Sequence, residues 1–413
     1  MAARRNPRDR SFDVVLYGAT GFVGRQTVAY FARHAKGLRW ALAGRSHDKL
    51  AALREASGAK GAGLVVADAA DAEALDALAA DARVVLSSAG PFARYGSALV
   101  AACARHGTHY CDITGETPWV RDMIDRHHAE AARNGARIVP CCGFDSVPSD
   151  LGAWLAASTL AREHGEACVS VKACFSLRGG LNGGTLASLI NILDSGERKR
   201  LADPFLLNPA PPKGIDPRRH ADPVAPHRDA DFKAWVGPFF MGPINTRVAR
   251  RSAALLSGRG KERIYAPDYH YQEYLRFGGG VAAGLIAAGM SVGMAVGQGA
   301  LRFKPARWVA EALGPPPGQG PSERTMDRGS FRCELVGVGE KGAVVRGRIA
   351  GRGDPGNRAT TIFVCESALA LARDADTLPG GAGYGGVLTP ASALGDVLAR
   401  RLAAAGMTIE PLA

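Results

Sequence analysis

The sequence lacks the residue patterns of a metal site and of a secretion signal. Its eight cysteines include no Cys-x-x-Cys pair, and no histidine-rich stretch accompanies them at zinc spacing. The first ten residues are charged and contain no apolar run of the kind that a signal peptide needs. We therefore expect no metal, reduced thiols and a cytoplasmic protein.

The sequence also lacks the short motifs of several enzyme classes. No tyrosine is followed by a lysine four residues later, so the Tyr-x-x-x-Lys proton relay of the short-chain dehydrogenases is absent. We expect no Gly-x-Ser-x-Gly nucleophile elbow and no Walker phosphate loop. Epimerase, hydrolase and kinase chemistry are accordingly disfavoured.

The composition is that of a globular protein with a surplus of basic residues. The chain has 413 residues, of which 46% are hydrophobic and 22% charged, and this length favours two domains over one. Lys and Arg number 51 against 39 Asp and Glu, which gives a formal net charge of +12. Such a field favours an acidic partner or an anionic surface. A GC-rich genome also enriches arginine, so we do not expect nucleic acid as the partner.

A glycine-rich turn near the N-terminus has the context of a dinucleotide site. Residues 13–17 form an apolar run typical of a strand, and Gly18-Ala-Thr-Gly-Phe-Val-Gly24 follows at once and opens a helix towards residue 34. Such glycines permit a tight turn, an approach to pyrophosphate and close helix packing, while the helix N-terminus attracts phosphate. The residues expected to contact the cofactor here are Gly18, Thr20, Gly21, Phe22, Val23 and Gly24.

The end of the second predicted strand indicates NADPH over NADH. Residues 39–43 lead into Gly44-Arg45-Ser46, where an NAD-selective site usually carries Asp or Glu for the ribose hydroxyls. The guanidinium of Arg45, with Ser46 beside it, can pair with a 2′-phosphate and stack on adenine. The alternative is an arginine that is merely exposed in a loop.

Strands and helices continue to alternate up to about residue 150. Predicted strands at 64–67, 84–87, 109–111 and 137–141 are separated by helical stretches, which is typical of a doubly wound parallel sheet of the Rossmann type. Ligands bind beyond the carboxyl ends of such strands. At that edge we expect further cofactor contacts from Asp68, a residue that could instead cap a helix, and from Ser88, Ala89, Gly90 and Pro91.

Residues 151–413 are predicted to form a second, α+β domain that carries substrate contacts and a possible dimer interface. A strand at 167–177 is expected to precede a helix at 185–193, and the proline-rich segment 204–227 to form a loop or lid. Strands at 331–338 and 343–350 flank a glycine turn and predict a hairpin. Helices are expected near 360–374 and 391–405, with the option that they pack back on the first domain.

An uncharged stretch covers residues 277–301 and is close to a membrane span in length. Its many glycines and alanines weaken insertion, while Gly289, Gly293 and Gly297 recur at a spacing that allows close helix packing. Three interpretations stay open: a helix buried in the protein or at an interface, peripheral contact with a membrane or lipid, and a true span.

Several sequence blocks together resemble the saccharopine dehydrogenase-like oxidoreductase family, in the branch that includes the trans-acting enoyl reductases of actinobacterial lipid and polyketide synthesis. The resemblance runs over nearly the whole chain and rests on residues 18–24, 43–46, 88–92, 110–116, 142–150, 183–188, 353–357 and 385–392. It implies an NADPH-dependent reductase of an α,β-unsaturated acyl or polyketide thioester in lipid or glycolipid biosynthesis. An acidic acyl carrier protein would suit the basic charge, and the inner face of the plasma membrane is a possible location.

Reduction of an enoyl thioester needs hydrogen-bond donors for an enolate oxygen and a proton for the α-carbon. The candidates at the correct edge are Tyr95, Tyr110 and Asp112, although Asp112 could equally cap the next turn. Asp145 and Ser146 are expected to cap a helix rather than to act in catalysis. Two other functions stay open: a saccharopine dehydrogenase that holds carboxylates with Arg178, Arg247, Arg250 and Arg251, and a non-catalytic NADP(H)-binding protein at a lipid surface.

Overall fold

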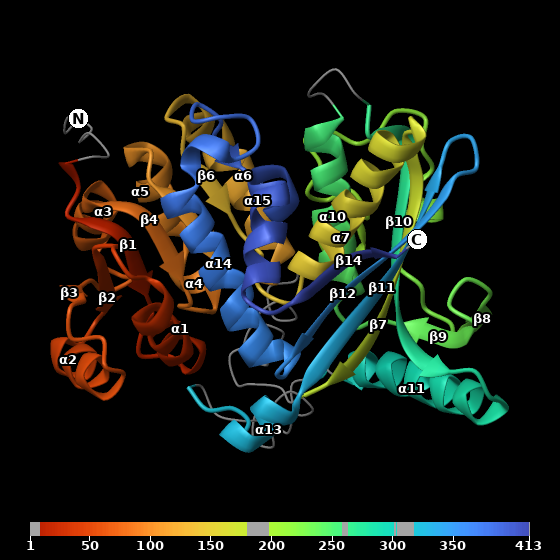
Figure 1. The fold of residues 1–413 in the computed structure, drawn as a ribbon, viewed down its shortest axis with the longest axis horizontal. Helices are drawn as coiled ribbons and strands as arrows, with labels where there is room; N and C mark the ends of the chain where they lie inside the picture. Colours follow the sequence, from red (N-terminus) through yellow and green to blue (C-terminus); the bar gives the residue numbers. More distant parts are fainter. Residues whose placement is uncertain (1–8, 180–197, 258–262, 301–302, 304–317, 413) are drawn as a thin grey trace.

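The computed structural model describes residues 9–179, 198–257, 263–300, 303 and 318–412. It contains two seven-stranded sheets, with the order β13-β6-β5-β4-β1-β2-β3 in the first (sheet A) and β14-β12-β11-β7-β10-β9-β8 in the second (sheet B). Figure 1 shows sheet A at the left, sheet B at the right, and helices α14 (Thr360–Arg373) and α15 (Pro390–Ala404) between them.

Sheet A is parallel throughout and doubly wound, as predicted. Its strand order reverses between β1 and β4, which is where ligands bind in such sheets. The strands are β1 (Phe12–Tyr17), β2 (Trp40–Gly44), β3 (Gly63–Val66), β4 (Ala82–Ser87), β5 (His109–Asp112), β6 (Arg137–Val139) and β13 (Gly386–Val387). The helices are α1 (Phe22–His34), α2 (His47–Ala56), α3 (Ala72–Asp81), α4 (Phe92–Tyr95), α5 (Ser97–His106) and α6 (Thr117–Arg133).

Alternate residues of β1 explain why both faces of sheet A are covered. Val14 and Leu16 belong to one buried cluster with α1 and α14, whereas Val15 and Tyr17 belong to another with α3, α5 and α6. The first cluster continues without a break into the inner face of sheet B. Near its edge, Tyr30 of α1 donates a hydrogen bond to Glu366 of α14 (2.7 Å).

Sheet B is mixed and packs one face on α7 (Val147–Thr159) and α10 (Gly242–Leu256). The predicted hairpin is present, with β11 paired antiparallel to β12. The strands are β7 (Cys168–Arg178), β8 (His227–Asp229), β9 (Ala234–Pro238), β10 (Tyr265–Gly278), β11 (Ser330–Gly339), β12 (Val344–Arg352) and β14 (Thr408–Leu412). The short helix α9 (Arg198–Ala202) contacts α6, and α13 (Glu323–Arg328) precedes β11. The helix expected at 185–193 lies outside the described residues.

Residues 204–227 were expected to form a loop or a lid, and the first of them form a loop that is packed in place. Leu206 and Leu207 are buried, and the buried Arg251 donates a hydrogen bond to the Leu207 carbonyl. Arg250 likewise donates to the Pro204 carbonyl (3.0 Å). These bonds hold the start of the segment against α10, because a buried guanidinium must keep its acceptors.

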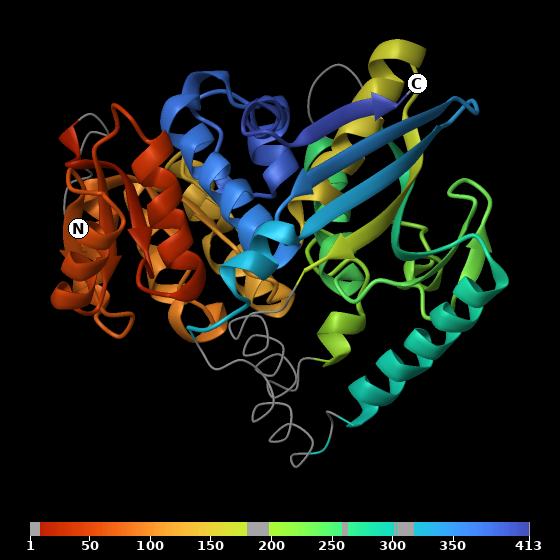
Figure 2. The same ribbon diagram turned by 60° about the horizontal axis from the view of Figure 1, so that its bottom comes forward.

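The uncharged stretch forms α11 (Val281–Ala300), which lies along the outside of the molecule in both views (Figures 1 and 2). Only a narrow stripe of it, Ala283, Ala287 and Ser291, is buried, so a fully buried helix is excluded. Added Cβ atoms at Gly289, Gly293 and Gly297 would meet nothing within 4 Å, so these glycines do not serve packing within the described chain. Among the described helices, none is both long and apolar enough to cross a membrane.

A Gly-x-Ser-x-Gly spacing does occur, contrary to expectation, at Gly289 to Gly293. It lies in the middle of α11 instead of at a strand-to-helix turn, and Ser291 donates its hydroxyl to the Ala287 carbonyl (2.8 Å). The geometry of a nucleophile elbow is therefore missing.

Candidate functional site

The glycine turn after β1 has the backbone geometry that a pyrophosphate site requires. Gly18 has a φ of +81°, and a Cβ added there would lie 2.8 Å from the backbone nitrogen of Ala89. A Cβ at Gly24 would lie 2.2 Å from the Gly18 carbonyl oxygen, so only glycine allows α1 to start this close to the turn. Gly21 caps α1 without a side chain, and the first turn carries no acidic residue. The N-terminus of α1 thus suits an anion.

Arg45 and Ser46 follow β2 at the same edge. Arg45 is exposed and makes no hydrogen bond or ion pair with any described residue. Ser46 caps α2 by accepting from the Lys49 backbone nitrogen (3.4 Å). Burial raises the pKa of Tyr17 to about 12, with Asp68 adding to this shift and Arg45 opposing it, so both charges act at the end of β1. Binding of a 2′-phosphate by this guanidinium stays a prediction.

Asp68 does not cap a helix. Its side chain accepts from the backbone nitrogen of Ala70 (2.9 Å), whereas Asp71 caps α3 through Glu73 and Ala74. The carboxylate of Asp68 is exposed at the carboxyl end of β3. Contact with an adenine amino group stays a prediction for this residue.

The loop after β4 is tied to the glycine turn. Ser88 donates its hydroxyl towards the carbonyl oxygens of Tyr17 (3.3 Å) and Gly18 (3.2 Å). Ala89 packs on Gly18, and the peptide between Gly90 and Pro91 is cis. These contacts place Ser88 to Pro91 beside the glycine turn. The nicotinamide half of a bound dinucleotide would lie near this point.

Two further contacts at this edge were not foreseen from the sequence. The buried carboxylate of Glu116 accepts from the backbone nitrogens of Phe92 (2.8 Å) and Ala93 (3.0 Å), which joins the loops after β4 and β5. Arg25 donates to the carbonyl oxygens of Thr20 (2.9 Å) and Gly318 (3.1 Å). A segment from the distant part of the chain therefore lies against the start of α1, and no local pattern announces such a contact.

The three residues predicted for catalysis differ in their surroundings. Tyr110 donates its hydroxyl to Asp112 (2.9 Å), and both side chains are fully buried. Asp112 also accepts from the backbone nitrogens of Thr114 (3.0 Å) and Cys141 (3.1 Å), and burial raises its pKa to about 7. This pair holds the loops after β5 and β6 together. Tyr95, on α4, has a side chain that is 43% exposed and open to a ligand.

Asp145 was expected to cap a helix rather than to act in catalysis, but its side chain makes no capping hydrogen bond to α7. It lies in the loop after β6, is partly buried, and makes no hydrogen bond or ion pair with any residue in the described ranges. Desolvation raises the pKa of its carboxyl to about 6. The N-cap of α7 is Ser146, whose hydroxyl donates to Asn245 (3.1 Å) instead of to the helix. The position after a parallel strand was visible in the sequence, but the lack of a partner was not.

The arginines considered for a dicarboxylate substrate do not converge. Arg247 pairs with Asp222 in a short ion pair, and Arg250 and Arg251 are buried and donate to backbone carbonyls. Arg178 lies apart from them at the end of β7. A carboxylate site built from these four residues is therefore contradicted.

Comparison with known proteins agrees with the geometry. The model of the saccharopine dehydrogenase NADP-binding domain matches residues 14–139. A Mycobacterium tuberculosis protein provisionally named trans-acting enoyl reductase is 42% identical over 420 residues, covering 97% of each chain. Trans-acting enoyl reductases of Mycobacterium bovis and Mycobacterium leprae are 39% and 38% identical, each comparison covering 98% of both chains.

A solved saccharopine dehydrogenase (L-Glu forming) of Saccharomyces cerevisiae is 15% identical, with a TM-score of 0.48 over 97% of this chain and 99% of that one.

Proposed function

This chain belongs to the saccharopine dehydrogenase-like family, together with the trans-acting enoyl reductases, and on that premise we propose that it reduces an α,β-unsaturated acyl thioester. Bound NADPH would supply a hydride to the β-carbon, while the double-bond electrons move to the thioester oxygen and the α-carbon takes a proton. The observation that carries this proposal is a dinucleotide turn in which Gly24 tolerates no side chain, next to a free Arg45.

The chain's own residues would bind and orient the cofactor. The backbone nitrogens from Gly21 to Gly24 would meet the pyrophosphate, and Arg45 with Ser46 would bind the 2′-phosphate. Asp68 would accept from the adenine amino group. Residues 88–91 would border the nicotinamide end, since Ser88 fastens that loop to the glycine turn.

We propose Asp145 and Tyr95 as groups that face the substrate, with Tyr110 and Asp112 as positioning residues. A carboxyl with a pKa of about 6 can hold a proton near neutral pH and release it to a carbon or an enolate. Tyr95 is exposed and can donate a hydrogen bond to the thioester oxygen. Tyr110 and Asp112 act through the loop geometry, because neither side chain reaches solvent.

The substrate side of the proposal includes the carrier and the pathway class. Acyl carrier proteins are acidic, and the net charge of +12 would draw one in. We propose lipid, glycolipid or polyketide biosynthesis as the setting, because the relatives that share nearly the whole chain carry the enoyl reductase name.

We further propose that α11 rests on a lipid surface at the cytoplasmic side of the plasma membrane. Its large exposed side chains are apolar, namely Val281, Leu285, Ile286, Met290, Val292 and Val296. No charged residue occurs from Phe277 to Leu301, while Arg276, Arg302 and Lys304 bracket the run, a pattern that suits an anionic interface.

Sedimentation with vesicles tests the lipid contact. The protein should bind vesicles that contain anionic lipid, and Leu285→Glu with Val292→Glu should reduce binding several-fold. Val344→Glu, which changes a valine that is also exposed but lies on the hairpin, is the matched control. A concentration-dependent dimer that the α11 variant dissociates, without vesicle binding, would contradict the lipid contact and indicate a homodimer interface.

The reaction itself is tested by supplying NADPH with a panel of α,β-unsaturated thioesters and identifying the product by mass spectrometry. Stoichiometric formation of the saturated thioester supports the proposal. Cofactor binding without oxidation on any member of the panel would contradict it.

A further inference from the structure

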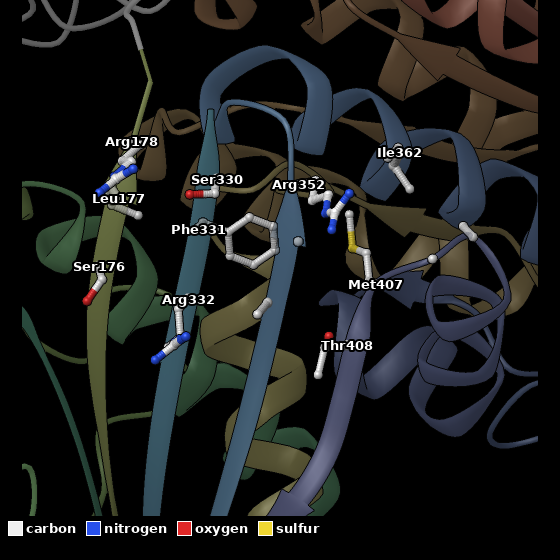
Figure 3. A pocket seen from close by; sticks show the side chains of 14 residues that line it. Ser176, Leu177, Arg178, Ser330, Phe331, Arg332, Arg352, Ile362, Met407 and Thr408 are labelled. Atoms are coloured by element: carbon white, nitrogen blue, oxygen red, sulfur yellow. The ribbon is translucent and has the colours of Figure 1, made fainter. Parts of the chain in front are cut away.

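Three arginines lie on one face of sheet B at the end nearest the N-terminus of α14. Arg178 of β7 is directly opposite Ser330 of β11, which in turn is opposite Arg352 of β12. Arg332 is two residues beyond Ser330 and so projects from the same face. Figure 3 shows these three side chains on neighbouring strands around one hollow. We refer to Arg178, Arg332 and Arg352 as the arginine triad.

The triad differs from the other basic residues of this face, which have acidic partners. Arg276 pairs with Glu334 (2.6 Å), Lys172 with Asp229 (2.7 Å), and Arg346 with Asp231 (3.5 Å). Arg348 pairs with Glu410 of β14.

No triad residue makes an ion pair or a side-chain hydrogen bond with the parts of the chain that the structure describes. Like charges on adjacent strands repel each other, so the triad costs stability unless an anion lies among its guanidinium groups.

A cavity of about 610 Å³ opens at the triad. Its lining includes the three arginines with Ser176 and Ser330, and it also includes the apolar residues Ile362 of α14 and Met407. This size lies within the range of small-molecule sites, and the lining combines charged anchors with apolar surface. A ligand with a phosphate at one end and an apolar or amide-bearing arm would match both the arginines and the apolar residues of the lining.

The cavity is connected through α14 to the loop that carries Asp145. Phe331 lies between Ser330 and Arg332, so its ring projects from the opposite face of sheet B, where it packs against Phe144 with ring centroids 5.0 Å apart. Phe144 directly precedes Asp145 in the chain. The Phe144 backbone nitrogen donates to the Thr360 hydroxyl (3.1 Å), which fixes this loop on α14 beside Ile362. An anion bound at the triad would therefore lie across sheet B from Phe144, while α14 contributes Ile362 to the cavity and Thr360 to this loop.

We propose that the arginine triad binds the phosphate of a phosphopantetheine thioester. This inference rests on the proposed function, because enoyl thioesters of coenzyme A and of carrier proteins share that phosphate-bearing arm. Arginine is suited to the task, since its planar fork binds phosphate oxygens through paired hydrogen bonds. The phosphate would be anchored at the triad while the arm passes Ile362 and the N-terminus of α14 towards the loop after β6.

Equilibrium binding tests the site without any need for turnover. The wild-type protein should bind phosphopantetheine about tenfold or more tightly than pantetheine, which lacks the phosphate. Arg332→Gln with Arg352→Gln should abolish this preference. Arg346→Gln with Arg348→Gln is the matched control on β12 and on the same face of sheet B, where each arginine has a carboxylate, and it should retain the preference. Equal binding of both probes by the wild type would overturn the proposal.

Kinetics then distinguish the two sources of the phosphate, coenzyme A and a carrier protein. They also distinguish a failure of the triad proposal from a failure of the proposed reductase activity. The triad variant should raise KM about tenfold for enoyl thioesters of coenzyme A and of a loaded carrier protein. The KM for the N-acetylcysteamine thioester, which has no phosphate, should not change. An effect confined to the carrier thioester, with phosphopantetheine binding unchanged, would mean that the arginines contact the carrier surface and would refute a phosphate site.

Turnover of all three substrates with equal losses would overturn the triad proposal and leave the reductase standing. Triad-dependent binding of phosphopantetheine without turnover of any thioester would support the triad proposal and overturn the proposed reductase activity.

Discussion

Replacing Arg45 should remove most of the preference for NADPH over NADH. Its guanidinium is exposed and makes no ion pair or hydrogen bond within the described ranges, so nothing in the protein rearranges when it is removed. A hydrogen bond to a charged group contributes about 1.5–3 kcal/mol, and solvent screening at an exposed position favours the lower end. About 1.4 kcal/mol corresponds to a tenfold change in Kd. Arg45→Ala should therefore weaken NADPH binding about tenfold and leave NADH binding nearly unchanged.

Titration of cofactor fluorescence measures both dissociation constants, and added salt should weaken NADPH binding more than NADH binding in the wild type. Arg45→Glu should go further, because a carboxylate repels the 2′-phosphate and accepts from ribose hydroxyls. The control is Arg54→Ala, which removes the same charge at the opposite end of α2. An unchanged NADPH preference in Arg45→Glu would refute the assignment of this residue.

Three further changes follow from the same geometry. Gly24→Ala should abolish cofactor binding and lower Tm, because its Cβ would lie 2.2 Å from the Gly18 oxygen. The control Gly61→Ala should be neutral, because its Cβ would meet nothing within 4 Å. A Gly24 variant that binds the cofactor normally would contradict the turn geometry. Asp145→Asn should lower kcat about 100-fold and remove a decline of kcat/KM as pH rises through about 6; retention of that limb would assign it to another group. Asp112 has a pKa raised to about 7, so the native state binds its proton more tightly than the unfolded chain; its contribution to stability is full below about pH 4 and is lost as pH rises to about 7. Asp112→Asn should flatten the pH dependence of denaturant unfolding across that window, and an unaltered slope would contradict the assignment.

The doubly wound sheet could be predicted because its signals are local. Residues 13–17 are apolar, a glycine turn follows and a helix begins, and this order repeats up to residue 139 with errors of one or two residues at the strand ends. The hairpin of β11 and β12 was equally local. Membership of β13 in sheet A was beyond reach, since Gly386 and Val387 pair with β6 across a long separation in sequence.

Site residues could be predicted where the backbone conformation of a local turn requires them. They were missed where contacts between distant segments determine their surroundings. The demand for glycine at 18 and 24 follows from the turn itself. The burial of Tyr110 and Asp112 follows from α5 and α6 packing over β5, which the sequence of a short strand does not disclose. For the same reason Asp145 resembled a helix cap. The sequence also could not show that the arginine triad lacks acidic partners while the arginines beside it have them.

The measurement that tests the central claim most directly is single-turnover mixing of the protein with NADPH and an α,β-unsaturated phosphopantetheine thioester. The account predicts loss of NADPH absorbance together with one equivalent of saturated thioester, much faster than with NADH. Tight binding of NADPH with no hydride transfer to any unsaturated thioester would contradict it.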